Sequence, residues 1–426
     1  MYSDFWGKLF FSLKFVVISA VVLIYLSFPA YGFYEFQGEE SSLDLRGFVR
    51  FFGAFNANPD NRAFYENSTD FSGVGIGRLL LDSRLSEQMA LELNGYQFFN
   101  TLTGAAVAPD SQGTSPGDVE RSSALEWKQQ DRSKSSASFA VDRLSLKIMS
   151  EEIDITLGRQ PVNFATTFYF TPNDFFGPFT AQTFYRVYKP GVDAARADVL
   201  LGELSQISIT GVFGYGPDSS SSNGWSNSPA LDRSSFLTRV VSTRSNFEWA
   251  LLGGKVANKN IIGASLQGDM FDWLGIRGEG HYAIPEDNSD NDFEFSIGIE
   301  HRFQNDITLQ GEFFHHGTGS DSVGNYEEGN VTIEAALPYL ARWYTAVGVG
   351  YQATPLLVID GVAVTNLIDG SNLFSFNAVY SLSNEAELSF ALAVPTGRRT
   401  KNNSKTIQSE FGLYPSSANI EVRMFF

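Results

Sequence analysis

Histidines and carboxylates are the side chains that most often bind metals or transfer protons, and this 426-residue chain has only four histidines. They are His281, His301, His315 and His316. His315 and His316 are adjacent in a predicted strand, so they point to opposite faces and cannot form a metal pair on one face. His281 and His316 could both face inward beside Glu294, which would give a metal site or an acid–base cluster. Strands two apart separate side chains by roughly 10 Å, so ordinary polar lining is the favoured interpretation.

Other signs of catalysis or of a cofactor are weak. The chain has no cysteine, which excludes disulfides, thiolate metal sites and c-type haem attachment. Gly73, Gly75 and Gly77 imitate a dinucleotide-binding fingerprint, but they recur with period two and no helix follows them. The formal charge of −18 argues against a nucleic-acid partner, because phosphate binding requires a basic face. We therefore expect no enzyme, no cofactor and no bound metal.

The elements that would position these side chains are strands. Segments of about ten residues with alternating apolar and polar side chains recur along the chain, and eighteen can be counted. The last of them, 419–426, places Ile420 and Phe426 on one face and Glu421 on the other. The 38 Phe, 17 Tyr and 39 Gly suit strands and hairpins. The composition and the period predict an all-β protein.

The connections between these segments alternate between short and long. Turns such as 86–88, 150–152 and 245–246 are tight, whereas the intervening connections are mostly longer, such as 56–73 and 216–235. Further long connections are expected at 100–137, 161–190, 317–341 and 395–416. Their Ser, Gly, Asn and Asp content predicts solvated loops without a second core. Short periplasmic turns and long outer loops are typical of a transmembrane antiparallel β-barrel, here of about 18 strands (16 to 18).

The N-terminus has the features of a signal peptide. Lys8 and Lys14 precede an apolar run over 15–28, and small residues follow at Ala30 and Gly32. The run is shorter than the ~20 residues that a membrane helix needs, which disfavours a retained anchor. We predict a cleaved signal peptide over 1–32 and a single barrel over 33–426, with no separate domain.

A secreted β-sandwich or β-helix would also alternate and could also carry a signal peptide. Against it, aromatic residues gather at strand ends on the oily face, as expected at a bilayer interface. The predicted periplasmic rim consists of Phe247, Phe271, Trp273, Phe303, Tyr351, Tyr380 and Phe426. The predicted outer rim consists of Tyr215, Tyr282, Phe293, Phe313 and Trp343.

With its signal peptide, strand-and-loop rhythm, aromatic rims and closing IEVRMFF, the chain resembles Gram-negative outer-membrane porins. The resemblance implies location in the bacterial outer membrane among its lipids. It also implies recognition of Phe426 by the barrel-assembly machinery, and a homotrimer. No motif names a particular porin family or solute.

A barrel of 16 to 18 strands is wide enough for an aqueous channel, which needs a polar lining. The strand phases place a basic arc inward: Arg46, Arg50, Arg78, Arg84, Arg143, Lys147 and Arg196. They also place an acidic arc inward: Glu248, Asp269, Glu279, Glu294, Glu300 and Glu312. Facing arcs would set a transverse field that favours polar solutes. Alternatively, the charges pair along the wall, which is the simpler interpretation for any one residue.

The connection 161–190 falls between the fifth and sixth strands, and the porin resemblance implies that this third outer loop folds inward as a constriction. Exposed apolar patches are costly, so a loop this rich in aromatic residues should be packed inside the barrel or against a neighbour. The candidate constriction residues are Phe168, Tyr169, Phe170, Asp174, Phe175, Phe176 and Arg186. Stacking of sugar rings is conceivable, but packing against the wall is favoured.

The sequence thus favours a passive diffusion channel for small hydrophilic solutes. The alternative is a structural barrel that encloses or docks a partner, such as a haem electron-transfer protein or export machinery. The sequence does not separate these two functions.

Overall fold

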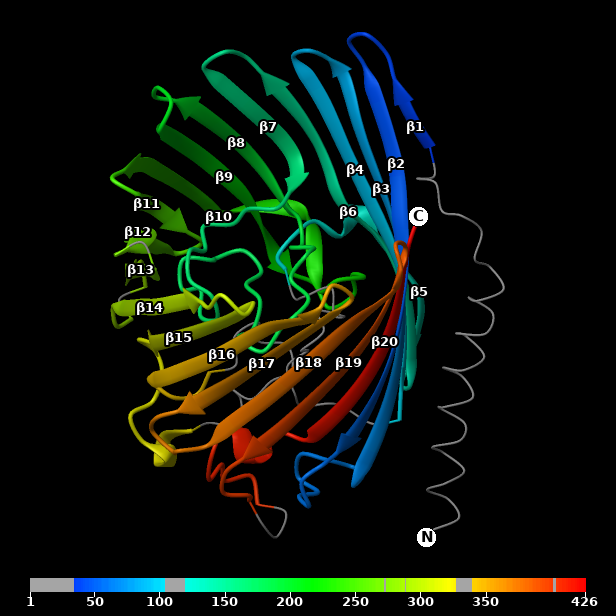
Figure 1. The fold of residues 1–426 in the computed structure, drawn as a ribbon, viewed down its shortest axis with the longest axis vertical. Coiled ribbons are helices and arrows are strands. Elements are labelled where there is room, and N and C mark those ends of the chain that lie inside the picture. The colour runs from blue at the N-terminus through cyan, green and yellow to red at the C-terminus, as the bar shows by residue number, and fades with distance from the viewer. Residues whose placement is uncertain (1–33, 104–118, 272, 288, 327–338, 401–403) are drawn as a thin grey trace.

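A computed structural model describes residues 34–103, 119–271, 273–287, 289–326, 339–400 and 404–426 (Figure 1). The predicted signal peptide lies outside the described residues. Within them, twenty strands form one antiparallel sheet, and eighteen of these strands close into a barrel. The predicted all-β fold and the strand number are confirmed. No helix in the described part of the chain is long and apolar enough to cross a membrane.

The barrel strands follow one another around the wall in chain order. They are β2 (Ser42–Ala57), β3 (Thr69–Ser86), β4 (Met89–Leu102), β6 (Ser135–Met149), β7 (Ile153–Gln160), β8 (Val192–Leu200), β9 (Ser205–Pro217), β10 (Trp225–Arg244), β11 (Phe247–Val256), β12 (Lys259–Met270), β13 (Leu274–Pro285), β14 (Asp292–Arg302), β15 (Ile307–His315), β16 (Trp343–Thr354), β17 (Leu357–Asn366), β18 (Asn372–Ser383), β19 (Ala386–Thr396) and β20 (Ser416–Phe425). The described parts of the connections contain three short 3₁₀ turns: η1 (Ser123–Leu125), η2 (Val323–Asn325) and η4 (Phe411–Leu413).

Two shorter strands extend columns of the barrel. β1 (Tyr34–Gln37) pairs with Ser42–Leu45 of β2, beyond the point where β20 ends. β5 (Glu126–Arg132) pairs with the start of β6, beyond the point where β7 ends. The predicted 100–137 loop therefore contains a strand. The predicted 216–235 loop is also mostly strand, because its polar residues continue β10 through two register shifts against β9.

The connections alternate as predicted between two ends of the barrel. The turn end carries the tight turns, the start of β2 and the end of β20. The loop end carries the long connections. Chain closure is antiparallel: β20 pairs with β2, and Phe426 exchanges two backbone hydrogen bonds with Gly47, of 2.7 and 2.9 Å.

Side chains alternate between the two faces of the wall, as strands require. In β14, Phe293 and Ile297 are about half exposed on the outer face, whereas Ser296 is fully buried on the inner face. Most of the predicted rim aromatics are exposed or half-exposed. Tyr215 is the exception, because it is only 4% exposed and its hydroxyl hydrogen-bonds Asp193. Its placement on an oily outer rim was wrong.

The expectation that the long loops build no second core was also wrong. Aromatic residues scattered among polar ones in different loops meet at the loop end and bury one another. The members contributed by the loops are Phe170, Ala181, Tyr326, Tyr339, Leu340, Ala341, Ile407, Phe411, Leu413 and Tyr414, which we call the loop core. It packs against inward side chains of the wall, including Phe314 and Tyr344.

Candidate functional site: the barrel interior

The connection 161–190 enters the barrel between β7 and β8, so we call it the inserted loop (Figure 1). It is the third connection at the loop end, as predicted. One wall carboxylate, Glu312 of β15, accepts hydrogen bonds from three consecutive backbone N–H groups of the loop. The donors are Phe168 at 2.8 Å, Tyr169 at 3.1 Å and Phe170 at 2.6 Å. A carboxylate accepts such bonds strongly, so Glu312 fixes the path of this stretch.

Glu279 of β13 anchors the flanking stretch in the same way. Its carboxylate accepts the backbone N–H groups of Thr166, of Thr167 at 3.3 Å and of Asn173 at 3.1 Å. Both glutamates belong to the predicted acidic arc, and both are at least 95% buried. Sequence phase placed them on the inner face but gave no sign that loop backbone would cover them.

Two glycines make room for the rings of the inserted loop. A Cβ on Gly298 would lie 3.0 Å from the Phe168 ring, and one on Gly348 would collide with the Tyr169 hydroxyl. Tyr169 instead reaches past Gly348 and donates to Gln310 at 2.7 Å. The Arg277 guanidinium lies 4.5 Å from the centre of the Phe168 ring. These rings therefore pack on the wall, which is the interpretation that the sequence favoured.

The other end of the inserted loop contacts the basic arc. Tyr185 lies between two guanidinium groups, 4.1 Å from that of Arg50 and 4.2 Å from that of Arg423. Both arginines hydrogen-bond the buried carboxylate of Glu421, with Nε–Oε1 distances of 2.5 and 2.6 Å. Tyr188 lies 4.8 Å from the Arg78 guanidinium. The loop thus spans the interior from β13–β16 to β2–β3 and β20.

The inserted loop also holds itself together with buried charges. Lys189 Nζ donates to both oxygens of Asp174 at 2.6 Å. Burial lowers the pKa of Lys189 and raises the pKa of Asp174, while their mutual attraction opposes both shifts. Arg186 donates to backbone carbonyls of the same loop, including that of Thr183 at 2.7 Å. Burial lowers the pKa of Arg186 as well.

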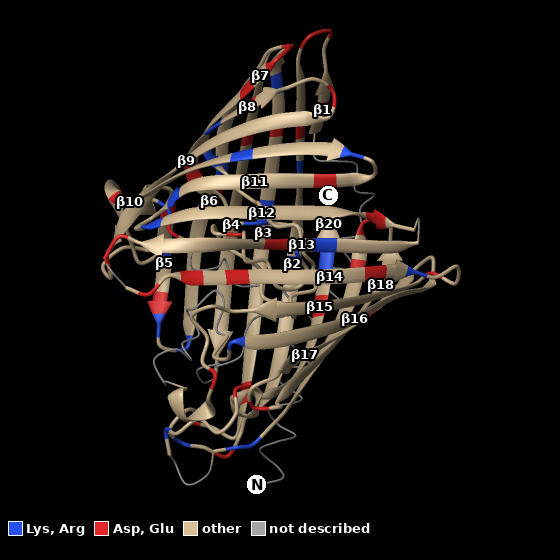
Figure 2. Cartoon of the chain, turned by 90° about the vertical axis from the view of Figure 1, so that its left-hand side faces the viewer, with Lys and Arg blue, Asp and Glu red and all other residues tan. Residues whose placement is uncertain are grey.

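The predicted basic arc is largely paired with acids. Arg46 pairs with Asp44 and Asp82, Arg50 with Glu421, Arg78 with Asp142, Arg143 with Glu92, Lys147 with Asp154, and Arg196 with Asp198. Arg84 is exposed near the turn end, without an ion pair to any described residue. Figure 2 shows basic and acidic positions interspersed along the strands. Paired charges cancel at a distance, so the arc acts mainly through its local contacts.

The rest of the acidic arc has other partners. Glu300 pairs with Arg277 at 3.3 Å, and Glu248 lies 3.8 Å from Arg239. Asp269 is exposed near the turn end.

The structure brings two of the three members of the predicted histidine cluster into contact and places the third opposite one of them. His316 Nδ1 lies 2.6 Å from Glu294 Oε1, and His281 is opposite Glu294 in the β13–β14 register. Phe175 of the inserted loop packs edge-on against the His281 ring, at 5.1 Å between centres. Among the described residues, no group of three His, Cys, Asp or Glu side chains is placed to hold a metal ion.

Sequence reasoning missed the segment 119–126, which lies in the interior beside the ends of β7 and β8. Arg121 forms ion pairs with Asp142 at 2.8 Å and with Glu126 at 2.5 Å. Arg159, at the end of β7, pairs with Asp193 at 2.8 Å and is fully buried.

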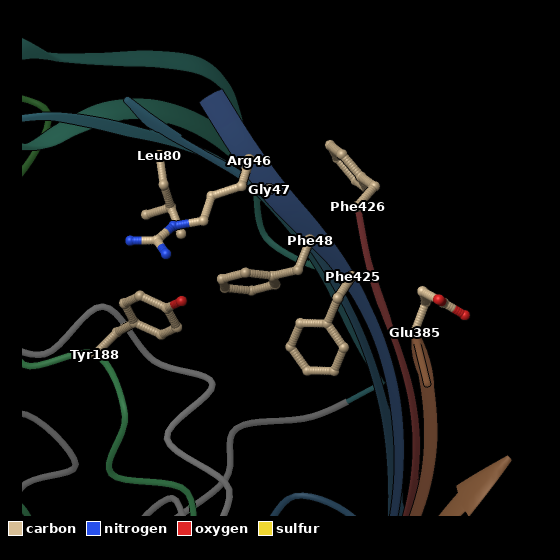
Figure 3. A pocket seen from close by; sticks show the side chains of 8 residues that line it. All are labelled: Arg46, Gly47, Phe48, Leu80, Tyr188, Glu385, Phe425 and Phe426. Carbon is tan, nitrogen blue, oxygen red and sulfur yellow. The ribbon is translucent and has the colours of Figure 1, made fainter. Parts of the chain in front are cut away.

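Where β2 pairs with β20 and closes the barrel, a recess of about 400 Å³ lies beside the C-terminus (Figure 3). Phe425 points inward with Phe48 and Tyr188, whereas Phe426 points to the outer side of the wall. A Cβ on Gly47 would lie 2.6 Å from the Phe426 ring, so the glycine gives the ring its place.

A closed antiparallel barrel of eighteen strands with a loop folded into its interior is the architecture of porins. Comparison with solved structures agrees. The chain is similar to OccAB4 of Acinetobacter baumannii, with 9% identity, a TM-score of 0.54 and coverage of 92% of this chain and 99% of that one. OccK7 (OpdD) of Pseudomonas aeruginosa matches with 9% identity, a TM-score of 0.53 and coverage of 91% and 99%.

A BenF-like porin from Pseudomonas fluorescens matches with 10% identity, a TM-score of 0.56 and coverage of 90% and 98%. No protein-family model and no curated protein sequence matches the chain. The chain therefore has the fold of a porin barrel.

Proposed function

We propose that the chain is an outer-membrane channel for passive diffusion of small hydrophilic solutes, with the inserted loop as its constriction. The observation that carries this proposal is the anchoring of that loop. Two wall carboxylates accept six backbone N–H groups of the loop, which holds it at a defined depth inside a barrel of porin width. A loop held in this way narrows the passage, and its thermal motion does not close the passage.

The alternative function, a sheath around a partner protein, is less well supported. The inserted loop and the segment 119–126 occupy interior space that a partner would need.

The remaining features of the proposal follow from the porin fold. We propose that the loop end faces outward from the cell, that lipids cover the apolar outer face, and that residues 1–32 are a cleaved signal peptide. Phe426 would be read by the barrel-assembly machinery. A homotrimer would be tested by native mass measurement of the protein in detergent.

Single-channel recording of the mature protein in a planar bilayer tests the channel function. We expect stable ionic steps, and deletion of residues 164–185 should raise the unit conductance because it removes the constriction. Glu151→Gln, in the exposed turn between β6 and β7 and away from the inserted loop, is the control and should leave the conductance close to that of the wild type. A barrel that inserts but stays silent would contradict a channel, and an unchanged current after the deletion would place the loop outside the path.

A further inference from the structure

A fully buried carboxylate, that of Glu410, lies beside the loop core and has no role in the transport proposal. Glu410 precedes η4 and is 1% exposed. Its Oε2 accepts hydrogen bonds from the Tyr344 hydroxyl at 2.5 Å and from Asn366 Nδ2 at 2.8 Å. Its backbone N–H donates to Asp369 at 2.8 Å. Glu410 thereby joins the connection 397–415 to the connection 367–371 and to the wall.

Among the described residues, no cation forms an ion pair with Glu410. The charged neighbour that acts on Glu410 is a second acid, Asp369. The other titratable groups facing the cluster are tyrosines: Tyr344 from the wall, Tyr326 and Tyr339 from the connection 316–342, Tyr414 from the connection 397–415, and Tyr65 from the connection 58–68. Arg186 of the inserted loop also acts on Tyr339. A carboxylate without a cation is costly to bury, so the neutral form fits this site.

The electrostatics agree with that geometry. Burial, reinforced by Asp369, raises the pKa of Glu410 to about 8. Burial also raises the pKa of Tyr339 and of Tyr414 above the usual tyrosine range, so both stay protonated at neutral pH. Glu410 is therefore the group of this cluster that changes charge between pH 5 and 9.

The loop core supports the inserted loop directly. The Tyr339 hydroxyl accepts the backbone N–H of Ala181 at 3.2 Å. Phe170 stacks on Phe314 with 4.8 Å between ring centres, and it contacts the Tyr339 ring at 5.4 Å. Tyr339 in turn lies 5.0 Å from Tyr344, the donor to Glu410. These rings connect the surroundings of Glu410 to the inserted loop.

We propose that Glu410 is a proton-operated latch. When protonated it closes the loop core over the inserted loop, and when ionised it releases the core and widens the passage. The widening rests on the proposed channel function, whereas the release of the core does not.

The sign follows from linkage. The proton is bound more tightly in the closed core than in the open one, where an exposed Glu has a pKa of about 4.3. The stabilisation of the closed core by this proton is therefore fully present below that pH, and it is lost as the pH rises to about 8. Because one proton is involved, the ratio of open to closed core should rise about tenfold per pH unit across this window.

Accessibility of a single thiol measures the release without needing a current. The chain has no cysteine, so Ser409→Cys, at a position 1% exposed beside Glu410, is the only thiol for a membrane-impermeant thiosulfonate reagent. Labelling is compared with that of Ser409→Cys combined with Glu410→Gln, which keeps the latch neutral. The ratio of the two rates cancels the titration of the thiol itself. Glu286→Gln, an exposed loop carboxylate paired with Lys255, is the matched control.

We expect the labelling rate of Ser409→Cys, divided by that of the double variant, to rise about tenfold per pH unit between pH 5 and 8. Adding Glu286→Gln to Ser409→Cys should leave the labelling rate unchanged at each pH. A flat ratio would overturn the latch, whatever the channel does. A rising ratio in a barrel that conducts no ions would keep the latch and refute the transport proposal. In a conducting barrel, the high-conductance state should gain occupancy over the same pH window, and Glu410→Gln should remove that gain.

Discussion

Gly348 shows how one atom on the wall decides where the inserted loop lies. Gly348→Ala would place a methyl group where the Tyr169 hydroxyl now lies, so the ring must move toward the lumen. We expect a lower unit conductance and a loss of about 1–3 kcal/mol in the free energy of unfolding, as for other overpacked sites. Single-channel recording and denaturant unfolding in detergent measure these two effects.

Gly350→Ala is the matched control, on the same face of β16 and two residues further on. Its Cβ would meet only the Asp360 side chain, at 3.3 Å, and that group can turn aside. Equal conductance in the two variants would show that Tyr169 does not border the passage.

The acidic arc shows which part of the residue-scale picture the sequence could predict. Period-two alternation places Glu279 and Glu312 on the inner face, and the structure has them there. Their partners are backbone N–H groups more than 100 residues away in the chain. A path of that kind depends on the whole loop, so residue types and spacing do not encode it locally. The same holds for Gly298 and Gly348, which read as ordinary strand glycines.

At the scale of elements, strands were predictable and loops were not. The alternating pattern of a strand is a local consequence of facing oil on one side and water on the other. Tyr215 was misplaced because the segment 119–126 covers it, and Glu120 accepts its backbone N–H at 2.6 Å. The first half of β10 was missed because its Ser, Asn and Asp residues have the composition of a loop, although β9 still pairs with it.

The closing element offers a prediction of its own. Gly47→Ala would place a Cβ 2.6 Å from both the Arg78 carbonyl oxygen and the Phe426 ring, at the point where the first and last barrel strands meet. We expect the barrel to lose about 1–3 kcal/mol of stability and to fold in lower yield. Urea unfolding in detergent and the gel mobility of the unheated protein measure this.

Gly77→Ala provides the comparison, since it lies on the neighbouring strand and its Cβ would meet only Val49, at 3.9 Å. If both variants fold equally well, the packing of Phe426 on Gly47 does not matter for closure.

At the scale of the whole molecule, the chain carries 48 acids and 30 Lys and Arg residues, yet the interior pairs most of the charges that face it. A paired wall has a weak field, so we expect low selectivity between small cations and anions. Removing one member of an interior pair should then reveal the charge of the other. Lys147 and Asp154, 2.7 Å apart and both partly exposed, form such a pair near the turn end.

Lys147→Met should make the channel more permeable to cations, and Asp154→Asn should make it more permeable to anions. One uncompensated charge about 8 Å from a passing ion contributes roughly 0.5 kcal/mol in water, which is about a twofold change in the permeability ratio. The reversal potential in a salt gradient should therefore move in opposite directions for the two variants, and both shifts should shrink as salt screens the charge. Shifts of the same sign would contradict local pairing as the origin of low selectivity, and no shift in either variant would mean that this part of the wall does not line the path of the ions.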